Sequence, residues 1–226
     1  MIKLHFQLVF IAAVSLGLAA ENPNPVTLGG FQAVSLNSSM KIQYEISEFE
    51  LQQVDQDGKS YVKLNMENAG SMSDPGDPYL PTVSTYYAVE PGKSFSVVVN
   101  IQEKEIIPNV DIMPFESWEP NRTGKLVKGD SYLRNVHYPE NIATVSDPIV
   151  MRGLTMVQVS VTPFQYNPVT EELTVIQSVE VELVEEGVVE MPFIPAKRSR
   201  AFEPLFESLV VNYASLSRDE IEYQQP

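Results

Sequence analysis

The chain has 226 residues, 43% of them hydrophobic, which suits a packed globular domain and excludes a disordered protein. Its 15 basic and 30 acidic residues give a net charge of −15, which argues against partners such as nucleic acid or anionic membrane surfaces. Cysteine is absent, so the sequence excludes disulfides, thiol catalysis and cysteine-based metal sites.

The first 20 residues have the pattern of a secretory signal peptide. Lys3 precedes an apolar run from Leu8 to Leu18 that is too short to span a bilayer, and small residues follow at Ala19 and Ala20. The polar stretch "ENPNP" comes next and favours cleavage. We therefore expect an exported protein, secreted or held in the cell envelope, with no membrane span after signal cleavage.

Alternation of apolar and polar residues dominates residues 21–190. It recurs in five runs, at residues 41–47, 61–66, 95–102, 153–161 and 172–184. Asp57-Gly58 and the stretch "QYNPVTEE" are hairpin signals between such runs. The pattern predicts an all-β domain, an antiparallel and jelly-roll-like β-sandwich, with Phe95, Val97, Val99 and Ile101 on one buried face.

The middle of the chain, residues 105–148, has no sustained period and contains five prolines. Long irregular segments in compact domains are usually functional loops. Four of the scarce basic residues gather here beside the single tryptophan: Arg122, Lys125, Lys128 and Arg134, with Trp118. The alternative for each of them is ordinary solubilising charge.

The C-terminal part changes character again. Residues 191–204 are predicted to be an exposed linker that carries a second basic cluster, Lys197, Arg198 and Arg200. Residues 205–226 are predicted to form a short helix, starting just after Pro204, and a polar tail.

Catalytic motifs are missing. After signal cleavage His137 is the one remaining histidine, and no nucleophile elbow, phosphate loop or metalloprotease motif is present. Asp55 and Asp57 only faintly suggest a calcium loop, and a plain hairpin turn explains them better. We therefore predict a non-catalytic protein without metal or cofactor.

Two alternatives stay open. One is a secreted carbohydrate- or surface-binding β-sandwich, for which Tyr86, Tyr87 and Trp118 would be the aromatic contacts. The other is a hydrolase that uses two acidic side chains in a cleft, which 30 acidic residues leave possible.

The order of several short motifs resembles the propeptide domain of gingipain-type cysteine peptidases, the C25 family. The motifs are "GDPYLPTVSTYYAVEPGKSFSVVV" from Gly76, Tyr138-Pro139, "RGLTMVQVSVTPFQYNPVTEELTVIQSVEVEL" from Arg152, and "LFESLVVNY" from Leu205. Together they cover roughly Lys41 to Tyr213. The peptidase domain with its His-Cys dyad is not in this sequence.

The resemblance implies a function as inhibitor and folding assistant of a cysteine peptidase catalytic domain, acting in cis in a longer precursor or in trans. A basic side chain would enter the substrate pocket of the peptidase. Carried onto this sequence, Arg122 or Arg134 would be that residue, with Lys125 and Lys128 as rivals. Trp118 and Phe115 would be neighbouring anchors, and the cluster from Lys197 to Arg200 would be the maturation site.

Overall fold

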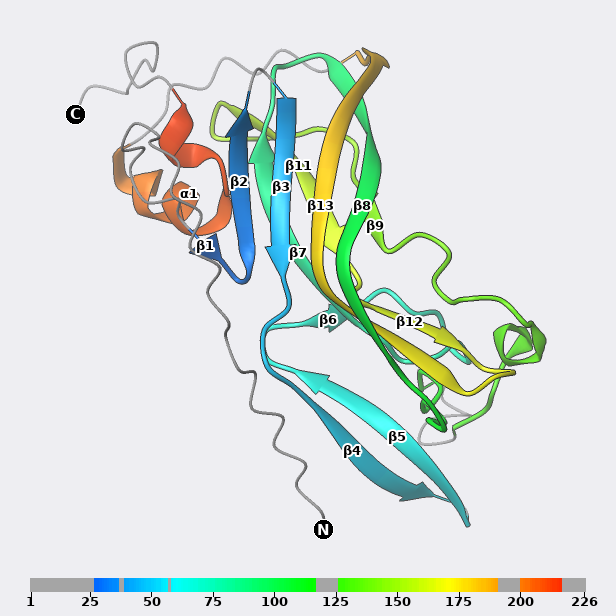
Figure 1. Cartoon of the computed structure of the whole chain (residues 1–226). Helices are drawn as coiled ribbons and strands as arrows, with labels where there is room; N and C mark the ends of the chain where they lie inside the picture. Colours follow the sequence, from blue (N-terminus) through cyan, green and yellow to red (C-terminus); the bar gives the residue numbers. More distant parts are fainter. Residues whose placement is uncertain (1–26, 37–38, 57, 117–125, 191–199, 217–226) are drawn as a thin grey trace, which may run out of the picture.

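The chain folds as a β-sandwich with one short helix (Figure 1). The computed structural model describes residues 27–36, 39–56, 58–116, 126–190 and 200–216. The strands are β1 (Thr27–Leu28), β2 (Phe31–Leu36), β3 (Ser39–Glu45), β4 (Phe49–Gln56), β5 (Lys59–Met66), β6 (Gly70–Ser71), β7 (Pro81–Ala88), β8 (Lys93–Ile107), β9 (Ala143–Val145), β10 (Ile149–Met151), β11 (Leu154–Val161), β12 (Phe164–Asn167) and β13 (Glu172–Val188). Helix α1 covers Glu203–Leu209, and short 3-10 helices cover Asp130–Leu133, Arg200–Phe202 and Tyr213–Ser215.

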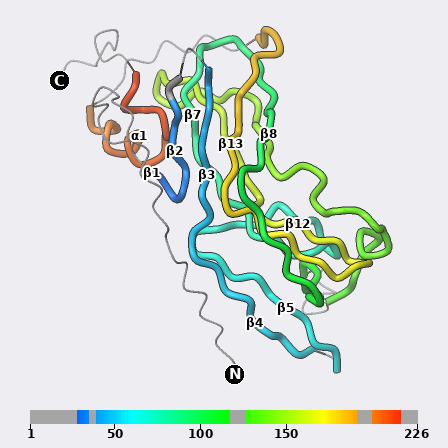
Figure 2. Tube along the Cα trace, in the orientation of Figure 1, coloured from blue at the N-terminus to red at the C-terminus, as the bar shows by residue number. Residues whose placement is uncertain are grey.

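Two antiparallel sheets make the sandwich, as the alternation predicted. The first has the order β1-β2-β3-β13-β12, with β8 on the other edge of β13. The second has the order β10-β11-β7-β6, with β9 also on β11. Strands β4 and β5 form a separate hairpin that extends beyond both sheets (Figure 1). The tube view in Figure 2 shows β8 and β13 following each other along the length of the molecule.

The main core lies between the two sheets and is built from the residues that alternate inward. From the first sheet it receives Phe31, Ile42, Tyr44, Val179, Val181 and Leu183, and from the second Val83, Tyr87, Val157, Val159 and Val161. Burying a side chain of this size contributes about 1.5–3 kcal/mol relative to leaving it in water. Because the chain has no cysteine, this core must hold the domain together without covalent links.

A second cluster of buried residues lies at the far end of β13. It contains Leu64, Leu80, Val110, Ile112, Tyr132, Phe164, Tyr166, Leu173 and Val175. Strand β13 serves both clusters because its register with β8 shifts between Ile176 and Ser178, a bulge that bends the strand. From the irregular middle of the chain, Val110, Ile112 and Tyr132 belong to this second cluster, whereas Ile142 belongs to the main core.

Three details differ from the expectation drawn from the sequence. Strand β13 continues past Val184 to Val188, because β8 starts at Lys93 and pairs with it to its end. Helix α1 begins at Glu203, so Pro204 lies inside its first turn, where a missing N–H costs nothing. Residues Phe95 to Ile101 share a face as predicted, but that face is only partly buried. Among the described residues, no helix has the length and hydropathy needed to cross a membrane.

Buried tyrosines give the fold a measurable response to alkaline pH. Burial raises the pKa of Tyr44, Tyr132 and Tyr166, and raises the pKa of Tyr138 to about 12, from an ordinary value near 10. The unfolded chain therefore releases these protons at a lower pH than the folded chain does. The stabilisation is complete below pH ~10 and is lost as the pH rises through the folded-state pKa values.

Replacing Tyr44 with Phe removes the hydroxyl and keeps the buried ring, so the contribution of the hydroxyl to stability can be measured by itself. The Tyr44 hydroxyl is buried and has no hydrogen-bond partner among the described residues, so its removal should raise the free energy of unfolding at neutral pH by about 1 kcal/mol. The loss of stability above pH ~10 should also become smaller. Urea titrations of both proteins at about pH 8 and about pH 11 measure both effects, and an unchanged pH dependence would contradict the assignment.

Candidate functional site

The two segments on either side of residues 117–125 are both hydrogen-bonded to one backbone turn, Gly76 to Tyr79. On the incoming side, Gly76 N–H donates to the Phe115 carbonyl at 3.0 Å and Phe115 N–H donates to the Asp77 carbonyl at 2.7 Å. On the outgoing side, Gly129 N–H donates to the Gly76 carbonyl at 2.8 Å. Both flanks of the basic stretch are therefore fixed by the same residue, Gly76.

The incoming flank is also part of a small ladder. Met113 N–H donates to the Val62 carbonyl at 2.9 Å, and Val62 N–H donates to the Asp111 carbonyl at 2.7 Å, so residues 111–113 lie beside β5. On the opposite side, Tyr79 N–H donates to the Met113 carbonyl at 2.9 Å. The ladder attaches the incoming flank to the second core, where Ile112 is fully buried.

Glycine is required at two places of this arrangement. Gly76 has a φ of +93°, and a Cβ on it would lie 3.3 Å from the Gly129 Cα and the Val127 carbonyl oxygen. A Cβ on Gly129 would lie 3.2 Å from the Gly76 carbonyl oxygen. The two backbones can approach this closely because neither residue has a side chain. The stretch "GDPY" thus positions both flanks of residues 117–125.

The positive charge of Lys128 makes its contacts within the domain. Its Nζ donates to both carboxylate oxygens of Asp111, at 2.6 and 2.7 Å. The same ammonium lies 4.8 Å from the centre of the Tyr132 ring and 5.6 Å from that of Tyr61. Since its charge is already paired and lies over two rings, Lys128 is a poor candidate for a side chain that enters the pocket of a partner.

Arg134 is free to make such a contact. It directly follows the 3-10 helix Asp130–Leu133 and its side chain is exposed, with no hydrogen bond or ion pair to the described residues. Two exposed apolar side chains accompany it, Leu133 (81% exposed) and Val136 (45% exposed). Arginine is enriched at protein–protein interfaces, and the two apolar side chains add surface that a partner would bury.

The turn that carries Arg134 rests on the β12–β13 hairpin. Asn167 Nδ2 donates to Asn135 Oδ1 at 2.9 Å, and Tyr138 and Tyr166 exchange two backbone hydrogen bonds of 2.8 and 2.9 Å. Behind the turn, the Tyr132 hydroxyl donates to the Ile112 carbonyl at 2.8 Å. The turn and the incoming flank are therefore fixed to the same core cluster.

The structure brings some of the residues predicted from the sequence together and leaves others outside its description. Phe115 stacks on Tyr79 with ring centres 5.8 Å apart, at the end of the incoming flank. Arg200 is exposed at the start of a 3-10 helix. Five further predicted residues lie outside the described residues: Trp118, Arg122, Lys125, Lys197 and Arg198. The sequence analysis did not identify Asp111 or Gly129 as part of this arrangement. Two glycines in the basic, irregular region, Gly124 and Gly129, were the signal that could have indicated a close backbone contact there.

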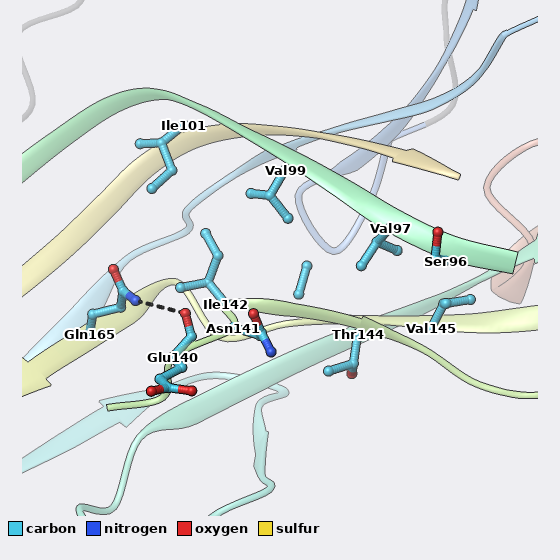
Figure 3. Close-up of a pocket in the computed structure, with 11 residues that line it drawn as sticks. Ser96, Val97, Val99, Ile101, Glu140, Asn141, Ile142, Thr144, Val145 and Gln165 are labelled. Carbon is cyan, nitrogen blue, oxygen red and sulfur yellow. Dashed lines mark hydrogen bonds between the residues drawn. The ribbon is translucent and has the colours of Figure 1, made fainter. Parts of the chain in front are cut away.

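A groove of about 520 Å³ opens between β8 and the segment that contains β9 (Figure 3). Its apolar lining comes from Val97, Val99, Ile101, Ile142, Ala143 and Val145. Of its polar lining residues, Gln165 donates to the backbone carbonyls of Pro139 and Glu140. Glu140 is the single carboxylate among the lining residues, and none of them is aromatic. The groove thus supports neither a hydrolase with paired acids nor a sugar-binding platform.

The other residues considered for sugar binding, catalysis or metal binding do not form such a site either. Tyr87 is buried in the main core, and Tyr86 packs against the C-terminal segment, so they do not form an exposed aromatic face. His137 and Asp55 are exposed, and Asp57 lies outside the described residues. Within the described residues, no group of three or more His, Asp or Glu side chains is placed to hold a metal ion.

Comparison with known proteins agrees with this architecture. The family model Propeptide_C25 matches residues 19–216. Gingipain R2 of Porphyromonas gingivalis is 26% identical over 214 residues, which is 90% of this chain and 28% of that protein. Lys-gingipain HG66 of the same species is 25% identical over 224 residues, which is 89% of this chain and 12% of that protein. The chain therefore spans less than a third of the length of these relatives.

Two solved structures share the fold. The complex of Porphyromonas gingivalis RgpB pro- and mature domains matches with a TM-score of 0.68 and 25% identity, over 84% of this chain and all of that chain. A structure that addresses the zymogenic latency of gingipain K from the same species matches with a TM-score of 0.56 and 19% identity, over 70% of this chain and 94% of that chain.

Replacing Gly76 with Ala should loosen both flanks at once. The methyl group would strain a positive φ and press on Gly129, so we expect a loss of about 1–3 kcal/mol in the free energy of unfolding. Hydrogen exchange of the Phe115 and Gly129 amides should become faster. Gly58→Ala is the matched control, because φ is +75° there but nothing lies within 4 Å of the added Cβ. Equal effects of the two variants on those amides would contradict the role of Gly76.

Lys128 and Arg134 should differ in what their removal does to the isolated domain. Lys128→Ala removes a paired, ring-stacked cation and should lower the free energy of unfolding by about 1 kcal/mol. Arg134→Ala should stay within about 0.5 kcal/mol of the parent, because it removes an exposed side chain. Urea unfolding of both variants tests this, and a larger loss for Arg134→Ala would show that Arg134 has a structural role.

Proposed function

This chain belongs to the C25 propeptide family, and we propose that it binds the catalytic domain of a gingipain-type cysteine peptidase, keeps it latent and assists its folding. The propeptide itself is the non-catalytic part. The partner domain would lie in the same precursor or be bound in trans. Support comes from the likeness to a prodomain in complex with its mature domain.

The observation that carries the proposal is the fixation of both flanks of the basic stretch by Gly76. An inhibitor that presents a basic side chain and the peptide bond beside it to a peptidase binds more tightly when the surrounding backbone is already ordered, because binding then does not cost the ordering of a loop. We propose that a basic side chain from this region enters the substrate pocket. Arg122 and Arg134 are the first candidates and Lys125 is a rival, while Lys128 is held by Asp111.

Tight inhibition would require an interface of ordinary size with a few buried anchors. A Kd of about 1 nM corresponds to roughly 12 kcal/mol, which interfaces of about 1,600 Å² with a few buried anchors supply. Leu133, Val136 and Phe115 are described candidates for such anchors, and Trp118 is another by its place in the sequence. The net charge of −15 would accelerate encounter with a basic face on the peptidase.

We further propose that the chain is exported through residues 1–20 and acts outside the cytoplasm, in the cell envelope or the medium. Release would follow cleavage at the second basic cluster, Lys197, Arg198 and Arg200. The exposure of Arg200 supports access by a peptidase with preference for basic residues.

Inhibition of a purified gingipain-type peptidase by residues 21–226 tests the proposal. We expect inhibition in the nanomolar range, and a weakening of at least about 30-fold, or roughly 2 kcal/mol, for Ala at the residue that enters the pocket. Arg122→Ala, Lys125→Ala and Arg134→Ala are measured one by one. Lys104→Ala on β8 is the control for the loss of one exposed positive charge.

The result is decided by three comparisons. Inhibition that falls for one of the three variants and not for Lys104→Ala identifies the pocket residue. A folded parent domain that does not inhibit either Arg- or Lys-specific peptidases would refute the inhibitory role. Equal inhibition by the parent and by a further variant that combines all three substitutions would refute the basic pocket contact.

A further inference from the structure

The segment after the second basic cluster is an integral part of the sandwich. Residues 210–212 lie along the edge of β7, where Tyr86 and Val210 form a parallel bridge and Val211 N–H donates to the Tyr86 carbonyl at 2.9 Å. Val211 is 4% exposed and belongs to the main core between the two sheets. The chain here extends the second sheet by a short strand-like addition.

Asn212 completes this edge with its side chain. Its Oδ1 accepts the Ala88 N–H at 2.8 Å, and its Nδ2 donates to the Ala88 carbonyl at 3.0 Å. Asn212 and Ala88 are both buried, so these two backbone groups would otherwise lack partners away from water. The side-chain amide thus replaces the ladder that a further strand would have made.

Helix α1 covers the outer face of the same sheet. Phe206 is fully buried against Ala88, Leu154 and Met156, and it stacks on Tyr213 with ring centres 5.6 Å apart. In front of the helix, the Arg152 guanidinium lies 4.5 Å from the centre of the Phe202 ring. Figure 1 shows this C-terminal segment at one side of the sandwich.

We propose that residues 203–216 are a latch that keeps the C-terminal piece bound to the sandwich after the chain has been cut in the cluster Lys197–Arg200. The contacts that hold the segment are made with β7, β10 and β11, so each of them joins the piece after the cut to the piece before it and needs no intact linker. Cleavage and separation are then two steps, and whatever is joined to the segment stays with the sandwich until the latch opens. This inference rests on the proposed cleavage site, but the binding surface itself does not depend on a peptidase.

A site-specific cut in the whole exported chain tests the latch without any gingipain-type peptidase. The recognition sequence of an unrelated endopeptidase replaces part of residues 191–199, and a fluorophore marks the C-terminal end. After complete cleavage, size-exclusion chromatography at about 1 μM protein should show the labelled piece eluting with the sandwich, which requires a Kd below about 1 μM. Separate elution of the labelled piece would overturn the proposal.

Three variants identify the contacts that hold the piece. Phe206→Ala should speed dissociation of the cut piece by at least about a hundredfold, because it removes the anchor of the helix. Asn212→Asp keeps the size of the side chain but places a carboxylate oxygen against the Ala88 carbonyl, so it should also release the piece. Leu205→Ala, on the same helix but 41% exposed, should leave the piece bound.

Circular dichroism of the uncut proteins shows whether each variant folds before the cut. If Phe206→Ala does not fold, Asn212→Asp and the parent still decide the question. A piece that stays bound equally well in the parent and in Asn212→Asp would overturn the role assigned to the β7 edge. Because inhibition is not the readout, a failure of the latch and a failure of the inhibitory function remain distinguishable.

Discussion

The burial of one continuous strand, β13, is the constraint on which the rest of the molecule depends. Its second half contributes Val179 and Val181 to the main core, and its first half contributes Leu173 and Val175 to the second cluster. The bulge after Ile176 turns the strand from one cluster toward the other. At the start of β13, the β12–β13 hairpin supports the turn that carries Arg134, because Asn167 donates a hydrogen bond to Asn135. This turn therefore lies at one end of the strand that contributes to both clusters.

Local patterns in the sequence were sufficient to predict the β-sandwich, but they did not predict the contacts of the candidate site. Period-two alternation correctly predicted the inward face of Val157, Val159 and Val161, and the hairpins at Gly58 and at "QYNPVTEE" are present. Alternation states which residues share a face, but it does not state what covers that face. The face from Val97 to Ile101 is therefore only half covered, because it borders an open groove. The contacts of the site join residues far apart in the chain, such as Gly76 with Gly129 or Asp111 with Lys128, and no local period encodes such pairs.

The scarce cations of this acidic chain divide into two groups. Lys41 pairs with Glu180 and Glu182 on the outer face of the first sheet, and the hydrogen bond that Lys41 donates to Glu180 raises the pKa of Lys41. Lys93 and Lys128 are likewise engaged with acids of their own domain. Such pairs relieve repulsion between neighbouring carboxylates and leave little charge for a partner. Arg134, like Lys104, is exposed and has no ion pair with the residues that the structure describes.

The two basic stretches contain the same types of side chain, but the backbone on either side of each is attached to the structure in a different way. On either side of residues 117–125, Phe115 and Gly129 are bonded to the same glycine, and a peptidase that binds there meets a backbone whose ends are already fixed. On either side of residues 191–199, the chain is attached to different elements: Val189 donates to the Gly92 carbonyl at the start of β8, and Phe202 lies under Arg152 between β10 and β11. A segment whose flanks are already held by backbone hydrogen bonds loses less conformational freedom on binding than one whose flanks are not. The two stretches thus share a residue type and differ in the backbone contacts on either side of them.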